Sequence, residues 1–256
     1  MAVLESFDGV KLHYDVEGAG PPVVLLHGFG ADTDHNWRSP GVMAALTASG
    51  RRVIAPDARG HGLSDKCYDH AAYENDAMAK DVIALFDALG LQDADVAGYS
   101  MGSGTALRFA QLDSRIRRLV LGGAGSGVVE RLRSGGTGRQ AQRAGRIAAA
   151  LEAADPDAID DPLAKGFRRF ADRTGADRQA LAAIQRSRRF LAFGELSEIK
   201  VPTLVICGDK DVSPHGLAEA LPAGRAELVS GDHLTAVADP AFAAKIVAFL
   251  GESDRR

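Results

Sequence analysis

The sequence predicts an α/β protein with a mostly parallel central sheet that carries helices on both faces. Two observations predict this class: short apolar runs recur along the chain, and longer segments with apolar residues at helical spacing separate them. Such alternation is typical of parallel strands that are buried on both faces. A third observation is that 46% of the 256 residues are hydrophobic, so the chain can bury a full core in one α/β unit.

Each strand and helix follows from a local pattern. Alternating side chains around residues 7–10 predict an antiparallel hairpin at a sheet edge. Residues 75–89 show helical spacing and end at Gly90, a common helix stop, and a last helix is expected over residues 242–250. Apolar runs predict strands at residues 23–26, 53–55, 96–98, 119–121 and 204–206, and a weaker run predicts one at residues 226–229.

Residues 124–197 break this pattern, because no clear strand occurs there. The segment alternates Gly-rich loops with Ala- and Arg-rich helical stretches, and it holds thirteen Lys and Arg residues but nine Asp and Glu residues. An insertion of this kind is typical of a lid. We therefore expect a core domain from residues 1–123 and 198–256, and a helical cap from residues 124–197.

The cap's side chains lead to two further expectations. Most of its arginines should be surface charges paired with Asp and Glu, although they could instead receive an anionic substrate. Phenylalanines at near-helical spacing should pack the cap onto the core, and one or two could also line a substrate pocket. These residues are Phe167, Phe170, Phe190 and Phe193.

The motif Gly98-Tyr99-Ser100-Met101-Gly102 carries the strongest functional signal. It lies between a predicted strand and a stretch of helix-forming residues. A G-x-S-x-G sequence at such a junction places serine on a sharp turn with its hydroxyl exposed. Glycine is needed at both ends because the backbone folds too tightly there for side chains. Ser100 is therefore the predicted nucleophile.

A serine nucleophile needs a base within hydrogen-bond reach and a group that orients this base. The loop after the strand at residues 204–206 contains Asp209 and Asp211, and His233 follows the next predicted strand. We predict that His233 is the general base and that Asp211 holds its tautomer. Asp209 is the alternative acid.

The glycine-rich segment after the first parallel strand predicts an oxyanion hole. It reads Leu-His-Gly-Phe-Gly over residues 26–30, and its glycines let backbone N–H groups approach a developing negative charge. We assign the two donors to the backbone amides of Phe29 and Met101, the latter being the residue after the nucleophile.

On these motifs the chain resembles the α/β-hydrolase fold superfamily, in particular esterase-like serine hydrolases with an inserted cap. The resemblance covers residues 20–121 and 200–250 and includes the block Arg-Val-Ile-Ala-Pro-Asp-Ala-Arg-Gly-His-Gly-Leu-Ser-Asp at residues 52–65. The family's Gly-x-x-Asp pattern selects Asp211 over Asp209. The resemblance implies the family's sheet, nucleophile, base and oxyanion hole at the matching positions. It leaves the substrate open, because the cap largely sets it.

The expected function is hydrolysis of a small carboxylic ester through an acyl-enzyme, with no cofactor or metal. A serine nucleophile argues against reactions that use a carboxylate nucleophile, such as epoxide or haloalkane hydrolysis. Hydrolysis of a carbon–carbon bond or of a lactone uses the same apparatus and remains an alternative. An alternative of another class is a ligand-binding sensor or signalling protein that retains the triad.

The composition limits which partners and which cellular compartment are expected. A net charge of −4 gives no reason to expect nucleic acid or an acidic membrane surface as partner. No basic and apolar leader and no apolar run of about 18 residues is visible, so neither secretion nor a membrane span is expected. Two cysteines, Cys67 and Cys207, fit a reducing cytoplasm. The acids and histidine at residues 32–35 are expected to form a solvated loop and not a metal site.

Overall fold

The computed structural model describes residues 2–134, 138–187 and 195–252. Its eight strands form one sheet in the order β1-β2-β4-β3-β5-β6-β7-β8. The first two strands pair antiparallel with their neighbours and all others pair parallel. The strands are β1 (Ala2–Glu5), β2 (Lys11–Glu17), β3 (Pro22–Leu26), β4 (Arg52–Pro56), β5 (Ala94–Tyr99), β6 (Ile116–Gly122), β7 (Thr203–Gly208) and β8 (Gly224–Val229). The mostly parallel sheet and the edge hairpin are confirmed.

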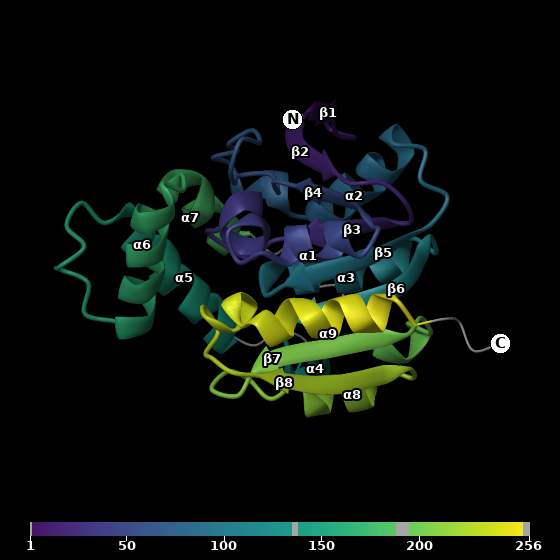
Figure 1. The fold of residues 1–256 in the computed structure, drawn as a ribbon. Coiled ribbons are helices and arrows are strands. Elements are labelled where there is room, and N and C mark those ends of the chain that lie inside the picture. Colours follow the sequence, from purple (N-terminus) through teal and green to yellow (C-terminus); the bar gives the residue numbers. More distant parts are fainter. Residues whose placement is uncertain (1, 135–137, 188–194, 253–256) are drawn as a thin grey trace.

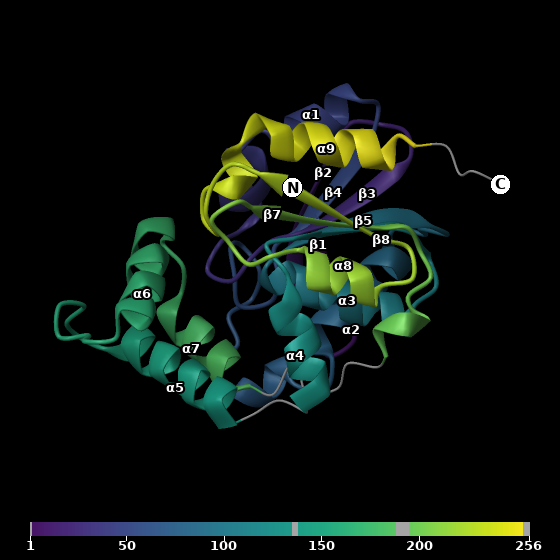
Figure 2. The same cartoon turned by 90° about the horizontal axis from the view of Figure 1, so that it is seen from below.

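Helices cover both faces of the sheet, as the sequence predicts (Figures 1 and 2). Helices α2 (Ala77–Ala88), α3 (Met101–Leu112) and α8 (His215–Ala220) pack on one face, and their apolar side chains share a core cluster with alternate strand residues such as Val24. Helices α1 (Val42–Ala48) and α9 (Pro240–Leu250) cover the other face, where Val23 points. Short helical turns lie at Asp34–Arg38, His70–Tyr73, Leu196–Glu198 and Ala236–Ala238.

The described part of the segment between β6 and β7 contains helices and no strand. It contains α4 (Ser126–Ser134), α5 (Gly138–Glu152), α6 (Pro162–Thr174) and α7 (Arg178–Arg186). Helix α4 packs against the sheet core, because Val128 belongs to the same cluster as α2 and α3. Figure 1 shows α5, α6 and α7, here called the cap helices, standing to one side of the sheet. The division of the chain at residues 124 and 197 stays a prediction.

The cap helices share a hydrophobic cluster with the core at the carboxyl end of the sheet. Ile147, Leu181 and Ile184 of the cap pack with Met101 and, at its edge, Phe29. The cap thus rests on the predicted nucleophile turn and the predicted oxyanion loop.

The block at residues 52–65 is held by buried charges. The Arg59 side chain is fully buried, and its guanidinium pairs with Asp81 at 2.6 Å and with Asp8 at 2.8 Å. Ser6 also donates a hydrogen bond to Asp81. This network ties the loop after β4 to α2 and to the edge hairpin.

We expect Arg59→Met to lower the free energy of unfolding by about 3–5 kcal/mol, because it leaves the buried carboxylate of Asp81 without its cation. Urea denaturation measures the change. Lys245→Met is the matched control: it removes the cation from an exposed pair with Glu227 and should cost about 1 kcal/mol or less. Equal losses in the two variants would contradict a structural role for the buried network.

Candidate active site

Ser100 lies on a strained turn between β5 and α3. Its backbone has φ 52° and ψ −106°, a region that non-glycine residues occupy only at a cost of about 1–3 kcal/mol. A Cβ atom on Gly98 would lie 2.3 Å from the Gly102 carbonyl oxygen, and one on Gly102 would lie 1.9 Å from that of Leu26. Both glycines are therefore required, as the motif predicts, and the hydroxyl of Ser100 is presented at the carboxyl end of the sheet.

The structure brings the three predicted side chains together. Nε2 of His233 lies 2.9 Å from Oγ of Ser100, and Nδ1 of His233 lies 2.9 Å from Oδ2 of Asp211. Each residue follows the carboxyl end of a parallel strand: Ser100 follows β5, Asp211 follows β7 and His233 follows β8. The carboxyl side chain of Asp211 is buried, with 6% exposed, whereas that of His233 is 41% exposed.

The hydrogen bonds assign the tautomer of the neutral His233 ring. A carboxylate only accepts hydrogen bonds, so Nδ1 donates to Asp211 and Nε2 carries the lone pair that faces the Ser100 hydroxyl. This is the arrangement in which a histidine can take a proton from serine.

Asp209, the alternative acid, has another position. Its Oδ1 accepts a hydrogen bond from the backbone N–H of Gly231 at 2.9 Å. This contact joins the loops after β7 and β8 and thereby supports the segment that carries His233. The geometry favours Asp211 as the partner of the histidine.

Two residues that the sequence did not single out position His233. The hydroxyl of Tyr99 donates to the backbone carbonyl of His233 at 2.8 Å, and the two rings lie 5.7 Å apart. Gly123 has φ +60°, and a Cβ atom there would lie 3.1 Å from Cε1 of His233. Tyr99 is part of the G-x-S-x-G motif, but its partner is 134 residues away and no local pattern could identify it.

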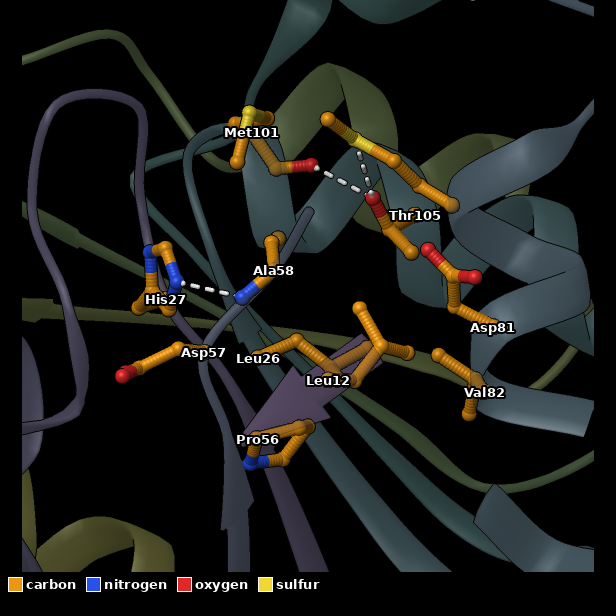
Figure 3. Close-up of a pocket in the computed structure, with 12 residues that line it drawn as sticks. Leu12, Leu26, His27, Pro56, Asp57, Ala58, Asp81, Val82, Met101 and Thr105 are labelled. Atoms are coloured by element: carbon orange, nitrogen blue, oxygen red, sulfur yellow. Dashed lines mark hydrogen bonds between the residues drawn. The ribbon is translucent and has the colours of Figure 1, made fainter. Parts of the chain in front are cut away.

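The loop that carries Phe29 is fixed on both sides. The side-chain oxygen of Asn36 accepts from the N–H of Gly28 at 2.7 Å, and His27 contacts the Gly28 carbonyl at 2.8 Å through Nδ1. The N–H of Ala58 donates to Nε2 of His27 at 2.9 Å (Figure 3), so the hydrogen of this ring is on Nδ1. Burial lowers the pKa of His27 and keeps the ring neutral.

Phe29 itself lies between core and cap. Its ring is 5.9 Å from that of His61 in the core and 5.7 Å from that of Phe167 in α6, in edge-to-face arrangements. Thr174 of α6 also donates a hydrogen bond to the Gly30 carbonyl at 2.8 Å. Cap packing therefore sets the position of the predicted oxyanion loop. The backbone N–H of Met101 is at the start of α3, where amides have no partner within the helix and favour negative charge.

A small cavity lies behind the oxyanion loop (Figure 3). It has a volume of about 30 Å³ and is lined by Leu26, His27, Ala58, Met101 and Thr105, among others. A water molecule occupies about this much volume in the liquid. The cavity therefore has room for little more than a water molecule.

Among the cap arginines that the structure describes, several form the expected surface pairs, such as Arg186 with Glu152 and Arg146 with Asp161. Arg168 differs, because it is buried: it pairs with Asp172 at 2.9 Å and donates to the Ala153 carbonyl near the end of α5. It holds α5 and α6 together and is not a surface charge.

The expected cap phenylalanines are only partly described. Phe167 contacts Phe29, and Phe170 lies beside Gly30, where a Cβ atom would come within 3.2 Å of its ring. Both therefore pack the cap onto the core, as predicted. Phe190 and Phe193 lie outside the described residues.

Neither cysteine lies in a disulfide. Cys207 is buried, and burial raises its pKa to about 12, so it stays a neutral thiol at physiological pH. Burial likewise raises the pKa of Cys67. Neither is activated as a competing nucleophile.

The described ranges 2–134, 138–187 and 195–252 contain no group of three or more His, Cys, Asp or Glu residues that could hold a metal ion. At residues 32–35, Asp32 instead bonds His35, and Asp34 pairs with Arg38. No helix within these ranges has both the length and the apolar character that a membrane crossing requires.

Residues 21–217 match the family model for the alpha/beta hydrolase fold. Together with the sheet order and the serine turn, this match shows that the chain belongs to the α/β-hydrolase fold family.

Individual relatives include several kinds of hydrolase. A 2-hydroxymuconate semialdehyde hydrolase from Pseudomonas sp. (strain CF600) is 40% identical over 119 residues, which are 45% of this chain and 41% of that protein. The chain thus matches about two fifths of the length of that relative. A hydrolase structure from Pseudomonas aeruginosa PA01 is 28% identical with a TM-score of 0.76, and the match covers 98% of each chain. An enol-lactonase structure from Burkholderia xenovorans LB400 is 26% identical with a TM-score of 0.71, covering 98% of this chain and 100% of that one.

Proposed function

We propose that this chain is a serine hydrolase that cleaves a small carboxylic ester through an acyl-enzyme. The observation that carries the proposal is the continuous hydrogen-bonded series from Ser100 through His233 to Asp211, with 2.9 Å at each step. Membership of the α/β-hydrolase fold family supports the same assignment. A buried carboxylate, a correctly oriented imidazole and a half-buried serine on a strained turn together form an activated nucleophile.

In the proposed reaction, Oγ of Ser100 attacks the ester carbonyl carbon while Nε2 of His233 takes the hydroxyl proton. The backbone amides of Phe29 and Met101 donate hydrogen bonds to the oxyanion, and each such donor contributes about 3–4 kcal/mol to lowering the barrier. His233 then gives its proton to the leaving alcohol, and the acyl-enzyme forms. Water attacks the acyl carbon, His233 takes a proton from that water, and Ser100 recovers its own. Asp211 stabilises the imidazolium in both halves.

The substrate we propose has a short acyl group. We propose that its hydrolysis needs neither a metal nor a cofactor. The buried cluster that the cap shares with the core contains many alanines, among them Ala148, Ala164, Ala171, Ala182 and Ala183, and its larger side chains Ile147, Leu181 and Ile184 already pack with Met101 and Phe29. Its aromatic side chain Phe167 is engaged with Phe29. A cap surface of this kind offers little free apolar area to a long acyl chain.

We propose that residues 124–197 form the cap that limits the size of the substrate. We also propose the cytoplasm as the compartment, because both cysteines are free thiols.

We expect p-nitrophenyl esters with acyl groups of about two to six carbons to be the best substrates. Each CH₂ that is buried gains about 0.8 kcal/mol, so kcat/KM should rise with chain length only until the pocket is filled. Measuring kcat/KM from acetate to palmitate tests this. A steady rise to twelve carbons or beyond would contradict the small pocket. Absence of turnover across the series would favour the non-catalytic sensor.

Lactone hydrolysis is a second candidate. Its specific support is the similarity to the enol-lactonase from Burkholderia xenovorans LB400, which extends over nearly all of both chains. The attack, oxyanion and proton transfers are the same, but the leaving alcohol stays attached to the acyl group. Parallel assays on a five-membered lactone and on the matching open-chain ester separate the two activities.

A further inference from the structure

A second pocket lies between the cap and the core, and none of the residues of the Ser100 site lines it. Its volume is about 260 Å³. The turn between α6 and α7 forms one wall, the loop after β3 forms another, and the loop after β4 together with β2 closes it. The exposed residues Asp34 and Leu63 form part of its lining, which gives it an entrance from solvent. We call it the acidic pocket.

The lining of the acidic pocket is strongly negative. Five aspartates contribute to it, and the cationic or basic residues are one lysine, Lys66, and one histidine, His13. The ammonium group of Lys66 is already engaged, because it donates to the backbone carbonyls of His61, Gly62 and Ser64. The aspartates are Asp15, Asp32, Asp34, Asp57 and Asp177.

His13 supplies an independent indication of a ligand. Its side chain is only 8% exposed, and Nδ1 lies 3.3 Å from Oδ2 of Asp57. In the neutral ring Nδ1 therefore carries the hydrogen and Nε2 is an acceptor. Nε2 is buried and has no hydrogen-bond partner within the described residues, its nearest acid being Asp15 at 3.7 Å. In this neutral tautomer Nε2 lacks the donor that buried acceptors normally have.

Asp32 provides a second acceptor. Its Oδ1 receives two hydrogen bonds from His35, one from the backbone N–H at 2.8 Å and one from the ring at 2.7 Å. Its Oδ2 accepts none from the described part of the chain. Asp177 is bonded through both oxygens, to the first amides of α7 and to the Tyr68 hydroxyl, yet it adds its charge to the wall.

We propose that the acidic pocket binds a small organic cation with at least two N–H donors, such as a primary ammonium or guanidinium compound. The imidazole acceptor of His13 and the carboxylate of Asp32 require donors. Arg38 beside the pocket already pairs with Asp15 and Asp34, so the charge that favours a cation is that of Asp32, Asp57 and Asp177, which outnumber Lys66. A volume of about 260 Å³ is slightly below the range of drug-sized pockets and suits a compact metabolite. The lack of a metal-binding group among the residues the structure describes favours an organic cation over a metal ion.

The bound cation would join the cap to the oxyanion loop. The pocket includes Gly30 and Thr33 on the core side and Thr174 and Asp177 on the cap side. Gly30 directly follows Phe29, and its carbonyl already accepts a hydrogen bond from Thr174. Occupancy would therefore strengthen an existing contact between the two parts.

Calorimetric titration with n-butylammonium tests the proposal, with n-butanol and tetramethylammonium as controls that lack the charge or the N–H donors. We expect saturable binding of one n-butylammonium, and affinities at least about tenfold weaker for both controls, because charge-assisted hydrogen bonds are lost. The Ser100→Ala protein should bind n-butylammonium as the wild type does. Equal binding of n-butanol, no saturable binding of n-butylammonium, or dependence on Ser100 would overturn the proposal.

Variants locate the site. Asp32→Asn should weaken n-butylammonium binding at least about tenfold, and Asp34→Asn at the rim should weaken it a few-fold. Asp93→Asn, in an exposed pair with Arg117 elsewhere, is the matched control and should bind like the wild type. If the Asp32→Asn protein does not fold, the affinity of the Asp34→Asn protein for n-butylammonium tests the location of the site. Unchanged affinity in the pocket variants, or displacement of n-butylammonium by calcium at constant ionic strength, would assign the binding elsewhere or to a metal and overturn the proposal.

Discussion

The Ser100→Ala protein is expected to lose ester turnover by a factor of about 10³ or more while keeping its fold. Without the nucleophile, only the oxyanion hole and substrate binding remain to accelerate hydrolysis. The fold should persist because alanine keeps the Cβ atom and therefore fits the same strained turn. kcat/KM on p-nitrophenyl acetate measures the loss, and urea denaturation checks the fold.

Ser103→Ala is the matched control for this prediction. Ser103 lies three residues further on, is fully buried, and donates to the carbonyls of Gly98 and Gly122. Its loss should reduce stability by about 1 kcal/mol and leave most of the activity. A serine-reactive phosphonate should label the wild type at Ser100, as read by mass spectrometry. Labelling at another residue, or substantial activity in Ser100→Ala, would show that the nucleophile lies elsewhere.

Much of the fold could be predicted because its signals are local. Each central strand is a short apolar run that is buried on both faces, and the helix at α2 shows its apolar spacing directly. Helix α1 and helix α8 are short and were not singled out. The placement of α4 could not be predicted either, since Val128 packs with residues that are distant in sequence.

The candidate site shows the same division. Ser100, Asp211 and His233 could be found because a motif, the order along the chain and the ends of strands identify them. Asn36 and Tyr99 act through single contacts with Gly28 and with the backbone of His233. The sequence predicts Arg168 to be a surface charge on an amphipathic helix. Its side chain is buried because it packs against the neighbouring end of α5. Such roles depend on three-dimensional neighbours and leave no periodic signal.

Asp211→Asn is expected to reduce kcat/KM by about 10³–10⁴, and Asp209→Asn by less than about tenfold. An amide at position 211 can donate to Nδ1 of His233, which places the ring hydrogen on Nε2. Nε2 then cannot accept the Ser100 proton, and the charge that stabilises the imidazolium is also lost. At position 209 the contact is a backbone N–H of Gly231 that donates to the side-chain oxygen. An asparagine oxygen accepts that bond equally well.

The pair of variants is informative because the two changes are chemically identical and two residues apart. Each replaces one carboxylate oxygen by an amide NH₂ in the same loop, so the two variants have the same net charge and side chains of the same size. Measuring kcat and KM separately adds a second test: loss of the orienting acid should lower kcat with little change in KM, since Asp211 contacts His233 and not the substrate. Equal losses in the two variants, or a larger loss at position 209, would move the orienting acid to Asp209 and contradict the hydrogen-bonded series that ends at Asp211.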